Sequence, residues 1–327
     1  MKRKYLLMLI KIKWILFVTV FFMMGISEQA DPLPSWNNTN TKRNIINYVE
    51  NAVNEKSPYY IPEEDRIATF DNDGTLVPEK PLIQILFSIE KVKEMAESDK
   101  SLLEKQPFKA IVTGDNEYLK TANEDEVISL TLKTLTNISE RQLREEVKDF
   151  VFKTTYPHLN KTIDKIVYKP QIELIKYLQK NKFKVYICSG GTVDFMRGMS
   201  KELYGIDSEN VIGSSNKYSY NEATGEMILE PELNSYNDGR EKAANIALII
   251  GKAPVISVGN VGAGGDIYML RYSQNGNKNY KTLQVLINHD DDKREFKYGE
   301  KNNISLNWAD KYKWNVVSMK NDWKEIF

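Results

Sequence analysis

Three short apolar runs stand out along the chain, at Ile67 to Phe70, Val185 to Cys188 and Val255 to Val258. Each run has the length of a β-strand, and each ends directly in a turn rich in Gly or Asp. Stretches with apolar residues at helical spacing precede the second and third runs, at 170–181 and 240–251. Strands that alternate with helices predict an α/β fold built on a Rossmann-like parallel sheet.

Residues 80–160 have a different pattern. Helical spacing recurs at 83–98, 124–135 and 139–152, charged residues are frequent, and strand-like runs are few. This pattern predicts a helical domain, residues 80–160, inserted after the first strand. The α/β core is then expected to comprise residues 28–79 and 161–327. Within it, 28–42 is predicted to be a polar linker with Pro32 and Pro34, followed by a helix at 41–53. Strands return at 282–288 and 314–319.

The first 27 residues form a candidate signal peptide. Lys2, Arg3 and Lys4 are basic, and the run from Trp14 to Ile26 is apolar without interruption. That run is shorter than the ~20 residues that span a bilayer, which favours a cleaved leader over a membrane anchor. Gly25 and Ser27 suit cleavage after residue 27, and cleavage after Ala30 is an alternative. We therefore expect an exported protein, periplasmic or secreted, with a membrane-anchored form as the alternative.

Composition narrows the range of partners. The chain has 327 residues, and its 45 Lys and Arg balance its 45 Asp and Glu, so no basic field predicts binding to nucleic acid. Contact with a membrane is expected only through an uncleaved leader. Cys188 is the single cysteine, which excludes a disulfide within the chain. Its place in an apolar run predicts a buried side chain.

The segment Asp71-Asn72-Asp73-Gly74-Thr75 follows the first predicted strand. A carboxylate attacks phosphorus without losing a proton first, so Asp71 is a candidate nucleophile. Asp73, two residues on, suits a general acid and base that protonates the leaving alkoxide. Gly74 allows the chain to turn sharply. Asp, Asn and Gly also favour ordinary turns, so the interpretation depends on further clusters.

Three such clusters follow other elements. Ser189, Gly190 and Gly191 come after the second strand, where a hydroxyl and glycine amides suit a phosphate. Lys242 lies near the start of the helix at 240–251, and Asp266 ends the glycine-rich segment after the third strand. A carboxylate such as Asp266 is a natural Mg²⁺ ligand. Because ligands bind beyond the carboxyl ends of parallel strands, we expect all these groups to meet there.

In this order the clusters resemble the four motifs of the haloacid dehalogenase (HAD) superfamily. The wider stretches Phe70 to Leu76, Ser189 to Arg197 and Val316 to Trp323 look like an exported bacterial phosphatase branch similar to phosphoserine phosphatases. The resemblance implies a HAD fold in which 80–160 is a helical cap. It also implies a phosphoric monoester hydrolase that forms an aspartyl-phosphate.

The resemblance assigns roles to single residues. Asp71 and Asp73 would be catalytic. Ser189, Gly190 and Lys242 would bind the phosphoryl group. Asp71, Asp73 and Asp266 would hold Mg²⁺, with Asp73 contributing its backbone carbonyl. Glu79 and Arg197 become candidate contacts for a small phosphorylated substrate, whose identity the sequence does not give.

Some positions depart from the family pattern. Asn260 stands where many members carry aspartate, and the segment from Val261 to Gly265, which precedes Asp266, is longer than usual. His289 to Asp292 carries three successive acids, and we expect a solvated loop there rather than a cation site.

Two other functions compete with the phosphatase. A non-catalytic phosphate- or ligand-binding protein on the same scaffold is the main alternative, but it would be expected to lose the nucleophile first. A haloacid dehalogenase is the other, and Asp73 argues against it, because a halide leaving group needs no proton.

Overall fold

The predicted parallel sheet is present at the centre of the computed structural model, which describes residues 30–121, 123–262 and 265–327. The predicted leader, residues 1–27, lies outside these ranges. In the described part of the chain the main sheet has the strand order β6-β5-β4-β1-β7-β8-β9. Every neighbouring pair is parallel except β5 and β6. Its strands are β1 (Ile67–Phe70), β4 (Lys184–Thr192), β5 (Val211–Asn221), β6 (Glu226–Ser235), β7 (Ile256–Asn260), β8 (Leu283–Asn288) and β9 (Asn315–Ser318).

The core strands are apolar because helices cover both faces of the sheet, so every position of β1 is buried. The helices of the core are α2 (Asn40–Val53), α8 (Lys169–Lys180), α9 (Val193–Tyr204), α10 (Arg240–Ile250), α11 (Asp266–Gly276), α12 (Ile304–Tyr312) and α13 (Met319–Asp322). The predicted strands and helices of the core are therefore confirmed, to within a few residues at their ends. Cys188 is fully buried, as predicted.

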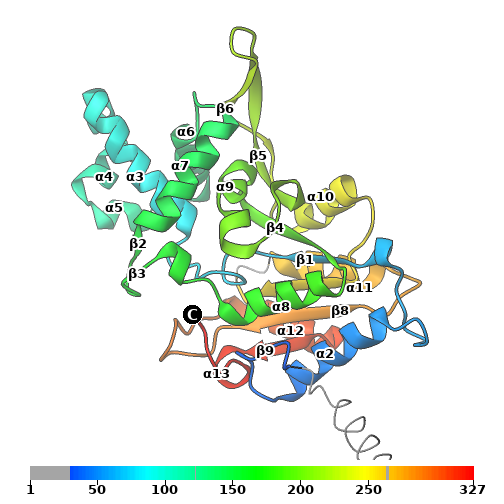
Figure 1. The fold of residues 1–327 in the computed structure, drawn as a ribbon. Helices are drawn as coiled ribbons and strands as arrows, with labels where there is room; N and C mark the ends of the chain where they lie inside the picture. Colours follow the sequence, from blue (N-terminus) through cyan, green and yellow to red (C-terminus); the bar gives the residue numbers. More distant parts are fainter. Residues whose placement is uncertain (1–29, 122, 263–264) are drawn as a thin grey trace, which may run out of the picture. The chain divides into compact units, whose positions relative to one another are not determined.

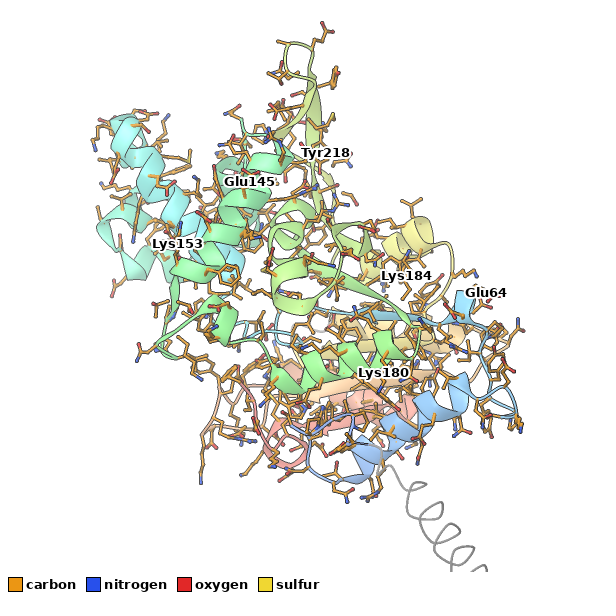
Figure 2. The ribbon with its side chains drawn as sticks, viewed as in Figure 1. Glu64, Glu145, Lys153, Lys180, Lys184 and Tyr218 are labelled. Carbon is orange, nitrogen blue, oxygen red and sulfur yellow. The ribbon has the colours of Figure 1, made fainter. Side chains whose placement is uncertain are left out.

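A helical segment follows β1, and a small two-stranded sheet follows that. Its elements are α3 (Ile83–Ser98), α4 (Phe108–Thr113), α5 (Asn116–Thr121), α6 (Glu124–Thr134), α7 (Glu140–Lys153), β2 (Thr155–Tyr156) and β3 (Lys161–Thr162). These helices gather at the upper left in Figure 1. Glu64 and Lys184, which precede or begin β1 and β4, lie on the opposite side in Figure 2. These helices, α3 to α7, together with β2 and β3 are called the insertion below. The insertion thus lies near the carboxyl ends of the strands of the main sheet.

Close packing attaches the insertion to the core. A Cβ atom added to Gly198 on α9 would lie 2.7 Å from Cβ of Val147 on α7, so only glycine allows the two helices this close. Arg144 of α7 donates a 2.7 Å hydrogen bond to Asp194, which is buried on α9. The ring of Phe87 on α3 also lies 5.4 Å from the ring of Phe195 on α9. Contacts of this kind fix α7 and the start of α3 against the core.

The structure corrects two expectations about the core. The predicted linker is not a linker from Leu33 onward, because Leu33 and Trp36 are buried and Trp36 donates to the carbonyl of Pro170. The chain does not turn directly after Cys188. Instead β4 continues to Thr192, with a shift of register against β5. Within the described residues, no helix is both long enough and apolar enough to cross a membrane.

Candidate active site

Asp71 lies directly beyond β1, the middle strand of the sheet. Its amide donates 2.9 Å to the carbonyl of Val258 on β7, so the ladder of the sheet fixes its backbone. The chain then turns tightly, since the carbonyl of Asn72 accepts from the amides of Thr75 and Leu76 at 3.1 and 2.7 Å. Thr75 also donates from its hydroxyl to Oδ2 of Asp71. The carboxylate therefore has a fixed position at the carboxyl end of the strand.

Gly74 permits this turn for two reasons. Its φ of +75° lies in the left-handed region, which favours glycine. In addition, a Cβ atom at this position would lie 1.9 Å from the side-chain nitrogen of Asn260. Asn260, at the end of β7, thus packs directly on the loop that carries the two aspartates.

Lys242 reaches the nucleophile candidate from the first turn of α10. Its Nζ donates to Oδ1 of Asp71 at 2.7 Å and to Oδ1 of Asp266 at 2.6 Å, and all three side chains are buried. Burial alone would disfavour the ammonium ion. The carboxylates of Asp266 and Asp71 outweigh burial and raise the pKa of Lys242 well above its usual value.

Asp266 begins α11, and its second oxygen accepts 3.0 Å from the amide of Asn260. Gly259 makes room for it, because a Cβ there would lie 2.5 Å from that oxygen. The structure thus brings Asp266 to Asp71 and Lys242, despite the long glycine-rich segment before it.

Asp73 is next to Glu79 in the same acidic group. Burial, and then the nearby carboxylate of Glu79, raise the pKa of Asp73 to about 7. Burial also raises the pKa of Glu79. A carboxyl group with a pKa near neutrality exists in both protonation states, as a general acid and base requires.

Hydrogen bonds fix the segment from Ser189 to Thr192, called the Ser189 segment below. Ser189 is fully buried, and its hydroxyl accepts from the amide of Gly191 at 3.1 Å. Ser214 holds the carbonyl of Gly190, and Gln84 of α3 binds both the amide and the hydroxyl of Thr192. The insertion therefore contributes directly to the shape of this segment.

A cavity of about 330 Å³ connects these groups. The core contributes polar residues to it, and the insertion contributes mainly apolar ones from α3 and α6. Its lining includes the predicted residues Asp71, Asp73, Glu79, Gly190, Lys242 and Asp266.

Arg197 is not among the residues that line this cavity. Its guanidinium donates to the carbonyl of Ser208 at 3.1 Å and lies 3.6 Å from Asp194. The arginine therefore connects Asp194, at the start of α9, with Ser208, which lies beyond the end of that helix, so the structure does not support the prediction that it contacts a substrate. Ser189 also does not line the cavity, although its neighbours Gly190 and Gly191 do.

The stretch from His289 to Asp292 is only partly the solvated loop that the sequence predicted. His289 is fully buried, with Nε2 2.8 Å from the carbonyl of Gly74 and Nδ1 3.2 Å from Oε2 of Glu295. Tyr168 donates to the other oxygen of Glu295. Asp291 is also buried and pairs with Arg294.

The acidic residues of the cavity suit a divalent cation. Asp71 and Asp266 bind the same ammonium group, and Asp73 and Glu79 add further acidic groups with no second basic residue among the described lining residues. Within the described residues, no group of three or more His, Cys, Asp or Glu side chains is arranged to hold a metal ion. Mg²⁺ needs only one or two protein carboxylates, because it keeps several waters and binds substrate phosphate. The oxygen donors here fit that requirement.

Comparisons with known proteins identify the family to which this fold belongs. The family model for haloacid dehalogenase-like hydrolases matches residues 68–253. The chain belongs to the haloacid dehalogenase-like hydrolase family. No curated protein matches it.

Solved structures share the fold at low identity. A conserved protein of unknown function from Anaerococcus prevotii has a TM-score of 0.54 and 14% identity, over 80% of this chain and 89% of its own. A protein of unknown function from Bordetella pertussis has a TM-score of 0.50 and 10% identity, over 77% of this chain and 97% of its own. These likenesses support the fold and say nothing of a substrate.

Proposed function

We propose that the protein is a Mg²⁺-dependent phosphatase that hydrolyses a small phosphate monoester through an aspartyl-phosphate on Asp71. The observation that carries the proposal is the buried contact of Lys242 with both Asp71 and Asp266 at the floor of a cavity. Membership of a hydrolase family gives the reaction class.

The residues perform the reaction in two steps. A carboxylate oxygen of Asp71 attacks phosphorus, the ester P–O bond breaks, and the carboxyl group of Asp73 gives its proton to the departing alkoxide. Asp73, now a carboxylate, takes a proton from a water molecule that attacks the aspartyl-phosphate. The P–O bond to Asp71 breaks, inorganic phosphate leaves, and both aspartates return to their starting states.

Lys242 and the Ser189 segment bind and orient the phosphoryl group. The ammonium group lies beside Asp71, where it stabilises negative charge on the phosphoryl oxygens as the P–O bond breaks. Mg²⁺ would be held by Asp71, Asp266 and the carbonyl of Asp73, and when bound it supplies positive charge between the phosphate and the nucleophile. Asn260 is proposed to act by packing on Gly74 and by orienting Asp266 through its amide.

The proposal extends to the segments around the site. Residues 80–160 are proposed to be the cap, since Leu82 and Val127 from this segment line the cavity. Export through residues 1–27 is also proposed, on the sequence pattern alone. Fractionation of cells that express the full chain would test it, and protein found only in the cytoplasm would contradict it.

Release of phosphate from 4-nitrophenyl phosphate tests the chemistry. The purified protein should be active with Mg²⁺, inactive in excess EDTA, and active again when Mg²⁺ is restored. Asp71→Asn should lower kcat by at least about 10⁴-fold, as loss of a covalent nucleophile does. Asp310→Asn is the matched control, because Asp310 is exposed on α12 and pairs with Lys313, which is also exposed. Unchanged activity of Asp71→Asn would refute the assignment of the nucleophile, and a fully active protein in EDTA would refute that of the metal.

A further inference from the structure

The cavity has two chemically distinct sides. The acidic side carries Asp71, Asp73 and Asp266 with Lys242, and the phosphoryl group must lie there for the proposed reaction to occur. The other side is an apolar wall, formed mainly by helices of the insertion. We use that name for Leu82, Ile85, Val127, Ile128, Leu132 and Leu233. When the phosphoryl group of an ester lies on the acidic side, its alcohol part occupies the space beside the apolar wall.

Charge limits what that alcohol part can be. Of the described residues that line the cavity, Lys242 is the only basic one, and both Asp71 and Asp266 already bind it. Glu79 and Asp238 are further acids in the lining. A carboxylate or second phosphate on the substrate would find no basic partner and would face like charges, which costs binding free energy.

Apart from the acids, Lys242 and Asn260, the described polar side chains of the lining are those of Gln84, Thr131, Thr192, Ser214 and Tyr236. Three of them are engaged within the protein, Gln84 with Thr192 and Ser214 with the carbonyl of Gly190. The side chain of Gln84 uses its nitrogen on the hydroxyl of Thr192 at 2.6 Å and its oxygen on the amide of Thr192 at 3.0 Å. Gln84 therefore holds the Ser189 segment in place, and its side chain is not available to hydrogen-bond a hydroxyl group of the substrate. Arg197, the basic side chain that the sequence suggested as a substrate contact, binds Ser208 and Asp194 instead.

Size gives a further limit. A volume of about 330 Å³ is at the lower end of the range for small-molecule pockets, roughly 300 to 1,000 Å³. It suits a phosphoryl group with a short alkyl chain or a single ring.

We infer that the substrate is a small phosphate monoester of an uncharged, predominantly apolar alcohol or phenol, with no second anionic group. This inference rests on the proposed function, because it takes the acidic side as the place of the phosphoryl group. It distinguishes the protein from phosphatases that act on phosphorylated amino or hydroxy acids, whose substrates carry a carboxylate.

A series of alkyl phosphates tests the role of the wall. From methyl to pentyl phosphate, the leaving alkoxides differ little in basicity, so changes in kcat/KM report binding of the chain. We expect kcat/KM to rise by up to about fourfold for each methylene that the cavity buries, the equivalent of ~0.8 kcal/mol. No increase along the series would overturn the inference.

A matched pair of substrates tests charge. Pentyl phosphate and 5-phosphonooxypentanoate have similar chains, but the second ends in a carboxylate. We expect kcat/KM to be at least about tenfold lower for the carboxylate ester. Equal or higher kcat/KM for the carboxylate ester would overturn the inference while leaving the phosphatase proposal intact. If neither these esters nor 4-nitrophenyl phosphate is hydrolysed with Mg²⁺, the phosphatase proposal itself fails.

A variant locates the effect on the wall. Val127→Thr keeps the shape of the side chain but places a hydroxyl against the alkyl chain. It should lower kcat/KM for pentyl phosphate by about five- to tenfold and that for methyl phosphate by much less. Val112→Thr is the matched control, because Val112 lies on α4, is partly exposed and does not line the cavity. Equal effects on both substrates, or equal effects of the two variants, would contradict a contact between Val127 and the substrate.

Discussion

Two buried polar networks meet at Gly74, and they differ in how their charges are balanced. In front of the loop from Asp71 to Thr75, facing the cavity, Asp71 and Asp266 share one ammonium group, that of Lys242, and Asp73 adds a further acid. Behind it, His289 connects the carbonyl of Gly74 to Glu295, and Tyr168 satisfies the second oxygen of Glu295. The front network has an excess of acids, whereas the back network gives each of these groups a partner.

This difference in charge balance indicates that the back network stabilises the fold, whereas the front network serves binding and reaction. A fully satisfied buried network adds rigidity and stability. A network with excess acid costs stability in the absence of ligands, and such local conflicts are expected where a protein binds and reacts. Substitutions in front should therefore affect activity more than folding, and substitutions behind should affect folding first.

After Asp71→Asn, the Asp73→Asn variant is expected to have the largest effect on activity. Loss of a general acid should lower kcat by about 10²- to 10⁴-fold for alkyl phosphates, and by less for 4-nitrophenyl phosphate, whose leaving group needs little protonation. Its free energy of unfolding at pH 7, measured without divalent ions, should be unchanged or higher, because burial and Glu79 already oppose a charge on Asp73. Equal slowing of all esters, or a large loss of stability, would contradict this assignment.

Lys242→Met tests the one cation of the front network. Its removal leaves the buried Asp71 and Asp266 without a cationic partner, so we expect a loss of about 3 to 5 kcal/mol in the free energy of unfolding at pH 7, with loss of activity. Denaturant titration measures the loss of free energy of unfolding. Lys252→Met is the control: Lys252 is half exposed and pairs with Asp65, and such a pair contributes about 0 to 1 kcal/mol. Similar losses in the two variants would show that Lys242 does not balance buried acids.

His289→Asn tests the back network. The shorter side chain leaves Glu295 or the carbonyl of Gly74 without its partner, which should cost about 1 to 3 kcal/mol of the free energy of unfolding. His158→Asn is a matched control, because His158 is the other histidine and is exposed. Its φ of +67° is one that Asn tolerates well. A stable His289→Asn protein with reduced kcat would instead place His289 in the reaction.

Asp291→Asn should have a smaller effect, and one that depends on pH. Burial would raise the pKa of Asp291, but Arg294 and the amides of Lys293 and Arg294 outweigh it and lower the pKa. A lowered pKa contributes stability above the unfolded value of about 4, and that contribution disappears as the pH falls through the folded value. At pH 7 the free energy of unfolding of the wild type should exceed that of Asp291→Asn by about 1 to 3 kcal/mol. Denaturant titration at several pH values should show this difference becoming smaller below about pH 4. A difference that does not change with pH would contradict the ion pair of Asp291 with Arg294.

Local sequence patterns predicted much of the core, for reasons that the structure makes clear. Strands β1, β4 and β7 are buried on both faces, so they appear as continuous apolar runs between turn residues. The hairpin of β5 and β6 was missed, because residues such as Tyr220 are exposed and its apolar alternation is weak. Leu33 and Trp36 were assigned to a linker, since isolated apolar residues among prolines do not reveal their distant partner near Pro170.

The sequence by itself determined which chemical groups are present and where each follows a strand or begins a helix. Asp71, Asp73, Lys242 and Asp266 could be singled out because their chemistry and local context are both encoded within a few residues. Only the tertiary structure decided the environment of His289, the partners of Arg197 outside the cavity lining and the composition of the apolar wall. Each of these depends on contacts between segments far apart in the chain, such as His289 with Gly74, and packing against a distant partner leaves no local periodic pattern.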